Sequence, residues 1–259
     1  MAIVGVLHPG AMGSAVGAAL RDQGHEALWA SEGRSAATVA RAQAAGMGDV
    51  GTVPAVLARA EVVLSICPPH AAVETAELAA GFDGVYVDAN AVSPDSARAA
   101  QAAAGGRFVD GGIIGPPPAQ GATTRLYLSG EEAADVARLF EGGPLEAIVL
   151  EGGVGAASAL KMAYAAWTKG TAALLVAIRA TARAHGVDDA LLDEWALSQP
   201  RLAERYERAV DSSAEKGWRW VAEMREIAQT FAAAGQPDGF HLAAAEVFAN
   251  PPGAVRSSS

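Results

Sequence analysis

The sequence predicts an α/β fold followed by an all-helical second domain. In the first 150 residues short β-like runs alternate with alanine-rich helical stretches, and after Gly152-Gly153 the pattern is helical throughout. Alternation of strands and helices implies right-handed crossovers and a mostly parallel, doubly wound sheet with helices on both faces. We therefore expect residues 1–151 to form one domain and residues 152–259 to form another.

The individual elements follow from short apolar runs and from helical periodicity. Strands are expected at residues 2–7, 26–30, 62–66, 85–88, 108–109, 124–128 and 147–150, and helices of the first domain at residues 14–23 and 36–45. The second domain opens with residues 154–185, which would form a straight helix about 48 Å long. Further helices are expected at residues 189–198, 201–210, 213–234 and 240–248, with a frayed end at residues 251–259.

The composition excludes several classes of function. The formal net charge of −10 carries no basic run, which argues against nucleic-acid binding. The single cysteine, Cys67, excludes an internal disulfide framework, and the scattered histidines lack metal-ligand spacing, so no metal site is expected. Without a membrane-spanning or leader-like segment, we expect a cytoplasmic protein that acts on a small molecule.

The stretch "VGVLHPGAMG" at residues 4–13 places a glycine-rich turn between a strand and a helix. Gly10 and Gly13 occupy the second and third glycine positions of a dinucleotide fingerprint, whereas His8 replaces the first and Pro9 stiffens the turn. Backbone N–H groups there could hold a phosphate at the helix N-terminus. The expected cofactor-binding residues are His8, Pro9, Gly10, Ala11, Met12 and Gly13. An ordinary glycine turn, with His8 filling space, is the alternative.

The segment "ASEGRSAAT" after the second expected strand bears on the choice of cofactor. An acidic residue at this point would hold the ribose hydroxyls of NAD, but Ser31 stands there, followed by Arg34 and Ser35. An arginine binds phosphate with a charge-assisted, forked contact. The sequence thus favours NADP over NAD, although Glu32 could hold ribose instead, and a solvated turn is the remaining alternative.

Five segments together carry a family likeness. In order along the chain they are "GVLHPGAMG", "VVLSICPP", "VYVDANAVSP", "FVDGGIIGPP" and "GGVGAASALKMAYAAW". With them the chain resembles the β-hydroxyacid dehydrogenase superfamily, which includes 6-phosphogluconate dehydrogenase and 3-hydroxyisobutyrate dehydrogenase. It is most similar to a branch that joins a Rossmann domain to a C-terminal helical domain of unknown function. The likeness covers most of residues 2–200.

This resemblance implies roles for particular positions. Cys67, Pro68 and Pro69 would lie beside the cofactor, and Asn90 would lie close to the nicotinamide ribose, as a cofactor-binding and catalytic residue. Lys161 matches the catalytic lysine of the superfamily. The resemblance also implies a homodimer, with each active site in a cleft between domains. The segment similar to the substrate loop consists of Gly111, Gly112, Ile113 and Ile114.

Departures from the family pattern point to a changed substrate. Ile114 stands where the superfamily has a serine for the substrate carboxylate, and Pro116 replaces the last glycine of that motif. One turn beyond the lysine, Tyr164 and Ala165 occupy the region where an asparagine is common. Since a site built to hydrogen-bond a group rejects analogues that lack it, losing these polar groups implies a different substrate.

The chemistry expected at Lys161 is general acid and base catalysis of hydride transfer. Reduction of a carbonyl develops negative charge on oxygen, which a positioned ammonium group can neutralise and protonate. Tyr164, three residues on, shares the same helix face and could orient the lysine or donate a proton. A half-buried lysine that merely extends to solvent is the alternative, and Lys169 is expected to be such a surface residue. His241 could reach the substrate from the second domain or from a partner subunit.

These observations predict an NAD(P)-dependent dehydrogenase or reductase that acts on a CH–OH group of a small hydroxy or oxo compound. An imine reductase-like enzyme is one alternative, because a protonated imine depends less on a lysine donor. A non-catalytic NADP(H)-binding protein is the other alternative.

Overall fold

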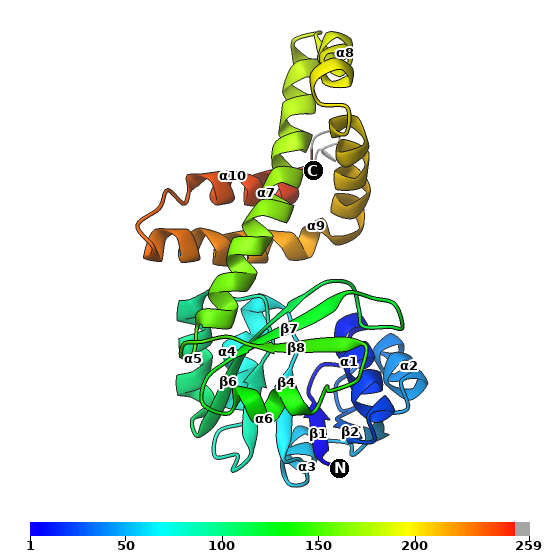
Figure 1. Cartoon of the computed structure of the whole chain (residues 1–259), viewed down its shortest axis with the longest axis vertical. Helices are drawn as coiled ribbons and strands as arrows, with labels where there is room; N and C mark the ends of the chain where they lie inside the picture. Colours follow the sequence, from blue (N-terminus) through cyan, green and yellow to red (C-terminus); the bar gives the residue numbers. More distant parts are fainter. Residues whose placement is uncertain (252–259) are drawn as a thin grey trace. The chain divides into compact units, whose positions relative to one another are not determined.

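The computed structural model describes residues 1–251, which form two compact units, Met1–Lys161 and the part beginning at Met162 (Figure 1). The frayed end expected at residues 251–259 lies, apart from Pro251, outside the described residues. We predicted that the cofactor-binding domain ends at residue 151, and this boundary stays a prediction.

The first unit contains one sheet in the order β3-β2-β1-β4-β5-β6-β7-β8. All neighbouring strands are parallel except β6 and β7. The order reverses at β1, which pairs with both β2 and β4, so the α/β, doubly wound, Rossmann-like prediction is confirmed. The strands are β1 (Ile3–Val6), β2 (Glu26–Trp29), β3 (Gly48–Asp49), β4 (Val62–Ser65), β5 (Val85–Asp88), β6 (Arg107–Ile114), β7 (Thr124–Ser129) and β8 (Leu145–Val149).

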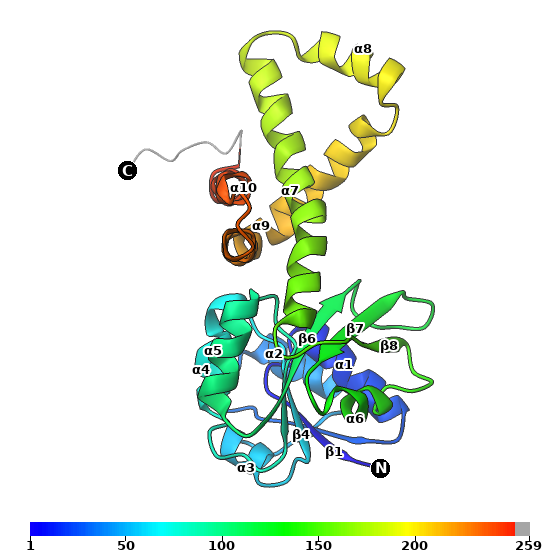
Figure 2. The same cartoon turned by 60° about the vertical axis from the view of Figure 1, so that its left-hand side comes forward.

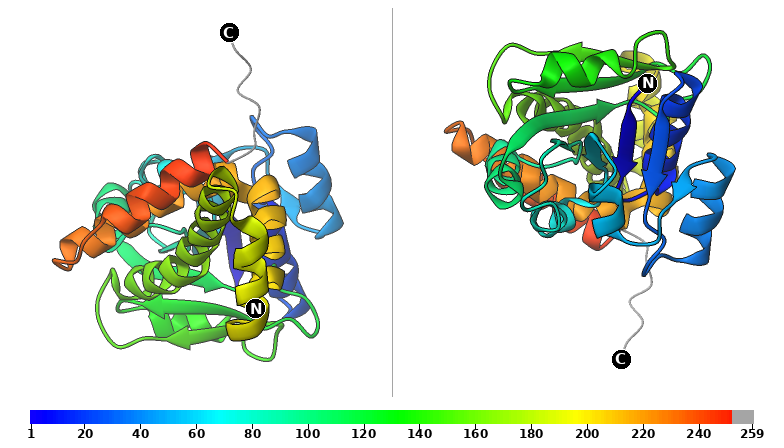
Figure 3. Two further views of the ribbon diagram at one scale, coloured as in Figure 1. Left: turned by 90° about the horizontal axis from the view of Figure 1, so that it is seen from above. Right: turned by 90° about the horizontal axis from the view of Figure 1, so that it is seen from below.

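Helices cover both faces of this sheet because side chains alternate along each strand (Figures 1 and 3). In β1, Val4 packs toward α1 and α6, while Leu7, just beyond the strand, packs toward the opposite layer. The first layer holds α1 (Ala11–Asp22), α2 (Ala36–Ala44) and α6 (Ala133–Arg138). The second layer holds α3 (Val53–Leu57), α4 (Ala72–Glu77), which follows the short helix η1 (Pro69–Ala71), and α5 (Pro94–Ala104).

The strand expected at residues 108–109 is much longer in the structure. β6 runs from Arg107 to Ile114 because Gly111 and Gly112 continue the strand instead of ending it. Glycine inside a strand often marks a close approach of another backbone, and a glycine pair is easily mistaken for a turn in a sequence. This extension carries β6 past the end of its parallel neighbour β5 and toward the start of α7 (Ala156–Ala184).

The second unit is helical, as predicted. It comprises most of α7, then α8 (Asp188–Ser198), α9 (Leu202–Ala233) and α10 (Gly239–Ala249), with α10 packed along α9 (Figure 2). The separate helices predicted at residues 201–210 and 213–234 are wrong, since α9 is continuous. Neither residue of the pair Asp211-Ser212 is a helix-breaking glycine or proline, and the helix continues through them. Figure 1 shows that α9 bends along its length. The Ser213 hydroxyl donates to the Ala209 carbonyl (2.5 Å), a contact typical of bent helices.

Polar pairs are buried among these helices. The Lys169 ammonium donates to the Glu223 carboxylate at 2.6 Å, and both side chains are largely buried. The expectation that Lys169 is a surface residue is therefore wrong, because α9 supplies an acidic partner that sequence spacing does not reveal. Arg179 is 6% exposed, binds Asp188 and lies over the Tyr206 ring. Within residues 1–251, no helix combines the length and the apolar composition needed to cross a membrane.

Candidate active site

The glycine-rich turn joins β1 to α1 at the carboxyl edge of the sheet. The Gly10 N–H donates to the His8 carbonyl at 2.8 Å, and Gly10 is the residue that precedes the first turn of α1. A Cβ atom on Gly13 would lie only 2.3 Å from the His8 carbonyl oxygen. Gly13 therefore has a role inside the chain: it lets α1 close onto the turn.

Gly10 has no such internal role. Its backbone has φ −67°, a value that any residue adopts, and no atom lies within 4 Å of where its Cβ would be. The space beside it opens at the N-terminus of α1, where free N–H groups and the helix dipole favour an anion. A dinucleotide fits this arrangement, because its pyrophosphate requires close backbone approach where a side chain would intrude.

Two polar atoms near this turn lack hydrogen-bond partners within the described part of the chain. They are Nδ1 of His8 and Nε of Arg34, and both are buried. Burial of the imidazole and, secondarily, the Arg34 charge lower the pKa of His8 to about 4. The turn thus presents a neutral imidazole at neutral pH. Because the Arg34 charge acts on His8, Arg34 lies near the turn.

The segment after β2 is held by an acid that the sequence analysis did not single out. Asp49, the last residue of β3, accepts hydrogen bonds from the Ser31 N–H (3.2 Å) and the Gly51 N–H (2.9 Å). Ser35 caps α2 by accepting from the Thr38 N–H at 3.3 Å, so its hydroxyl already has a structural role. A contact of Ser31, Arg34 or Ser35 with a cofactor stays a prediction.

Asn90 joins the carboxyl ends of β4 and β5. Its side-chain oxygen accepts from the Cys67 N–H (2.6 Å), and its side-chain nitrogen donates to the Ser65 hydroxyl (3.1 Å). Burial raises the pKa of the Cys67 thiol, which is thus protonated at neutral pH. The structure gives Asn90 the role of shaping the loop that continues into Pro68 and Pro69. Contacts of these residues with a nicotinamide ribose remain predictions.

Lys161 lies against the far end of β6. Its ammonium group donates to the backbone carbonyl of Ile113 at 2.8 Å. A Cβ on Gly112 would lie 2.9 Å from both the Ala157 carbonyl oxygen and the Lys161 Cβ. A Cβ on Gly111 would lie 3.0 Å from the Asp88 carbonyl oxygen. Both glycines thus allow close packing that brings the lysine to the strand.

The two isoleucines predicted in the substrate loop are buried. Ile113 is 7% exposed, packs within the sheet core and offers its carbonyl oxygen to Lys161. Ile114 is 4% exposed and provides no hydroxyl. Substrate binding by this segment stays a prediction.

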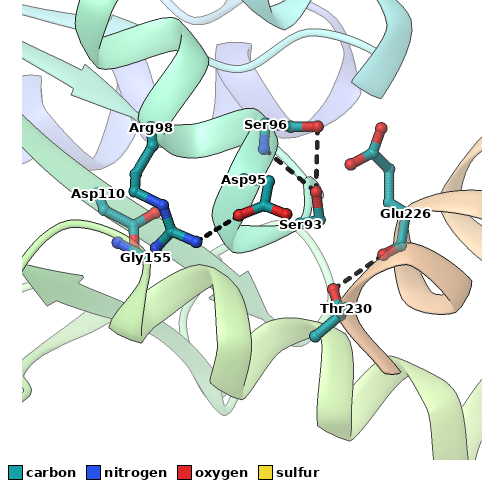
Figure 4. A network of polar contacts seen from close by, with 8 residues as sticks. All are labelled: Ser93, Asp95, Ser96, Arg98, Asp110, Gly155, Glu226 and Thr230. Atoms are coloured by element: carbon teal, nitrogen blue, oxygen red, sulfur yellow. Dashed lines mark hydrogen bonds and ion pairs between the residues drawn. The ribbon is translucent and has the colours of Figure 1, made fainter. Parts of the chain in front are cut away.

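Asp110 is a second acid that the sequence analysis did not single out. It is fully buried in β6 and accepts a hydrogen bond from the Gly155 N–H at 2.9 Å (Figure 4). Figure 4 also shows the start of α5, where Ser93 caps the helix and Arg98 pairs with Asp95. A carboxylate inside the apolar run "FVDGGII" could have indicated this residue from the sequence, since a buried charge requires hydrogen-bond partners.

Two further predicted residues lie in the helical unit. Tyr164 follows Lys161 by three residues on α7 and is 46% exposed. His241 is 7% exposed, and its ring packs against the Phe231 ring at 4.2 Å. Burial lowers its pKa. His241 therefore packs in the core of its own unit, and a role in substrate binding stays a prediction. Among residues 1–251, no group of three or more histidine, cysteine, aspartate or glutamate side chains could hold a metal ion.

Comparison with known proteins places this geometry in context. Residues 182–250 match the family model described as a domain of unknown function, DUF1932. The structure is similar to that of MTH1747, a conserved protein of unknown function described as similar to 3-hydroxyacid dehydrogenases. The two are 28% identical with a TM-score of 0.72, over 95% of this chain and 96% of that one.

Residues 182–250 are thus similar to the DUF1932 domain, and the chain has a 3-hydroxyacid dehydrogenase-like fold. The resemblance recognised from the five segments is thereby confirmed. The chain also shares its fold with Mycobacterium tuberculosis 3-hydroxyisobutyrate dehydrogenase, solved with L-serine, at 18% identity and a TM-score of 0.67 over 96% of this chain and 93% of that one.

A third structure with this fold is the Aspergillus terreus reductive aminase in complex with NADPH and ethyl levulinate. It is 20% identical to this protein, with a TM-score of 0.60 over 96% of this chain and 93% of that one. Among curated proteins, none is a significant match to the sequence.

Proposed function

We propose that this protein is an NAD(P)-dependent oxidoreductase that interconverts a small hydroxy compound and its oxo form, with Lys161 as the general acid and base. The observation that carries this proposal is Gly10. Its backbone does not require glycine, yet it opens an unobstructed space at the N-terminus of α1. Lys161 supplies an ammonium group at β6, a strand of the same sheet.

NADP(H) is the cofactor that we favour. Arg34 lies close enough for its charge to act on His8, and its Nε has no hydrogen-bond partner in the described chain. A guanidinium group in that position could bind the 2′-phosphate that distinguishes NADP from NAD. The Aspergillus terreus reductive aminase, which shares the fold, was solved with NADPH. His8, neutral at physiological pH, adds no charge of its own to the turn.

A nicotinamide dinucleotide bound here would supply the hydride. The role of Lys161 is to give a proton to the developing alkoxide in reduction and to receive it in oxidation. The Ile113 carbonyl accepts a hydrogen bond from the ammonium group, which directs this group toward the end of β6. Positioned proton transfer of this kind contributes about 10²–10⁴-fold to the rate.

The substrate is expected to differ from the carboxylates of the superfamily. Ile114 is buried where the superfamily carries a serine, so the end of β6 offers no hydroxyl there. This favours a substrate whose far end is apolar, such as a ketone or an alcohol. Imine reduction is the second candidate, favoured by the same missing hydroxyl and by the fold shared with a reductive aminase.

We further propose that the protein forms a homodimer through its helical unit. Large apolar side chains are exposed on that unit, including Trp167 (63%), Trp218 (70%) and Phe240 (76%). A cavity of about 400 Å³ between α7 and α9 is lined by Trp167, Trp220 and Arg205, among others. Aromatic and arginine side chains are enriched in protein interfaces, which supports an interface on the helical unit. Light scattering at micromolar concentration should give twice the chain mass, and a monomer would contradict the dimer.

A binding and turnover screen tests the function. Fluorescence titration with NADPH and NADH measures affinity without any substrate. The oxidation of each cofactor is then followed against oxo acids, ketones, aldehydes and cyclic imines, with reverse assays on hydroxy compounds. We expect tight NADPH binding and turnover of at least one carbonyl compound. Turnover of imines alone would favour the second candidate. Binding without any turnover would favour a non-catalytic NADP(H)-binding protein, and absence of binding would refute the proposal.

A further inference from the structure

Asp110 binds the first turn of α7 through all of its side-chain acceptor atoms. Its Oδ2 accepts from the Gly155 N–H (2.9 Å), the Ser158 N–H (3.0 Å) and the Ser129 hydroxyl (3.1 Å). Its Oδ1 accepts from the Ser158 hydroxyl at 2.6 Å. The carboxylate is completely shielded from solvent. These contacts connect the middle of β6 to the start of the helix that carries Lys161.

The backbone around Gly155 is shaped for this contact. Gly155 has φ +106°, a conformation that side chains disfavour, and it directs its N–H toward Asp110. The Ser129 hydroxyl, which donates to Asp110, also accepts from the Ala157 N–H at 3.1 Å. The side chains of Asp110 and Ser129 thus accept from N–H groups that the first turn of α7 leaves without a helical partner. The Asp110 carboxylate also lies at the positive end of the helix dipole.

The same strand and helix meet a second time, farther along. Asp110 contacts Ser158, and three residues later on both elements Ile113 contacts Lys161. Residues three apart on a helix lie on one face, so both contacts use the same face of α7. Between them lies Gly112, whose missing side chain lets the two backbones touch. The helix is therefore attached to β6 at two points.

We propose that Asp110 is a positioning residue for Lys161. By holding the first turn of α7, its carboxylate fixes the distance and the rotation of the helix relative to β6, and thereby keeps the lysine ammonium at the Ile113 carbonyl. This inference rests on the proposed function for its catalytic consequence, but not for the position of the lysine itself. A residue that only stabilises the fold would not change the surroundings of Lys161 in molecules that remain folded.

The surroundings of Lys161 can be measured directly by NMR, because the chain has few lysines. Its lysines are Lys161, Lys169 and Lys216. Reductive methylation with ¹³C-formaldehyde therefore gives a short list of dimethyl-lysine NMR signals, and loss of one signal in Lys161→Arg assigns Lys161. The test variant is Asp110→Asn, which keeps the shape but removes the charge. The matched control is Thr52→Ala, which removes a side-chain cap from α3 in the same unit.

In Asp110→Asn we expect the Lys161 signal to move toward that of Lys216, while the Lys169 signal stays in place. We expect kcat for the substrate found in the screen to fall at least tenfold, with NADPH affinity within about twofold of the wild type. Thr52→Ala should lower the melting temperature without moving the Lys161 signal. An unchanged Lys161 signal in folded Asp110→Asn would overturn the inference.

A second variant keeps the test decisive if Asp110→Asn does not fold. Ser158→Ala removes the Oδ1 contact but keeps the backbone contacts of Oδ2, so a smaller shift of the same Lys161 signal is expected. If Asp110→Asn does not fold, an unmoved signal in Ser158→Ala overturns the inference. The NMR readout needs neither cofactor nor substrate. Failure of the wild type to bind NADPH would therefore refute the proposed function while leaving the NMR test of Asp110 intact.

Discussion

The ammonium group of Lys161 donates a 2.8 Å hydrogen bond to the backbone carbonyl of Ile113. This contact links α7 to β6 of the doubly wound sheet. It is possible because Gly112 has no side chain. A side chain there would collide with the Ala157 carbonyl and with the Cβ of the lysine itself. The position of the lysine is thus set by backbone packing as well as by its own hydrogen bond.

Gly112→Ala should displace α7 from β6. Forcing a methyl group into a packed contact typically costs about 1–3 kcal/mol of unfolding free energy, and the lysine would move with the helix. We expect a lower midpoint of denaturant unfolding and a fall of at least tenfold in kcat. Gly153→Ala is the control, because nothing lies within 4 Å of its Cβ position. Wild-type turnover in Gly112→Ala would show that the close contact is dispensable.

The two glycines of the turn should respond to alanine in opposite ways. Gly13→Ala places a Cβ 2.3 Å from the His8 carbonyl oxygen and should destabilise the fold. Gly10→Ala meets no atom of the chain, so the thermal midpoint should stay close to the wild-type value while NADPH affinity falls at least tenfold. Calorimetry and fluorescence titration measure the two effects. Unchanged NADPH affinity in Gly10→Ala would argue against a pyrophosphate at this turn.

His8 should make stability depend on pH. Its pKa is lowered to about 4 in the folded protein from a usual value of 6.5, so as pH falls from 6.5 toward 4 the unfolded chain takes up the proton first. The free energy of unfolding should therefore decrease over that range. His8→Gln should lack this component, and His70→Gln, at an exposed position, should retain it. An NMR titration that places His8 near 6.5 would contradict this explanation.

Arg34→Ala tests the preference for NADP. Loss of a charge-assisted contact to phosphate costs about 1.5–3 kcal/mol, so NADPH affinity should fall about 10-fold or more. NADH affinity should stay unchanged, since NADH has no 2′-phosphate. Arg41→Ala, an exposed arginine on α2, is the matched control. An equal loss for both cofactors would assign Arg34 to a different part of the dinucleotide.

Much of the fold could be predicted from the sequence because its signals are local. The apolar run at β4 and the turn around Gly10 follow from residue type and order. The length of β6 did not follow, because Gly111 and Gly112 resemble a turn until their packing partners are known. The continuity of α9 was missed because polar residues at its bend look like a break.

The candidate site was predictable where it resembles a family motif. Lys161 was found in that way. Its hydrogen-bond partner is the backbone carbonyl of Ile113, which a pattern of side chains cannot predict. Asp110 and Asp49 were missed because they accept hydrogen bonds from backbone N–H groups far along the chain, 45 residues away for Gly155 and 18 for Ser31. The burial of Lys169 was missed because Glu223 lies 54 residues away on another helix.

The most direct test compares Lys161→Met with Lys216→Met by measuring NADPH affinity and the rate of hydride transfer in the same samples. Methionine keeps most of the length of the unbranched side chain but cannot give or take a proton. We predict that Lys161→Met binds NADPH within about twofold of the wild type and transfers hydride about 10²–10⁴-fold more slowly, whereas Lys216→Met matches the wild type. Hydride transfer at a near-normal rate in Lys161→Met would contradict the account.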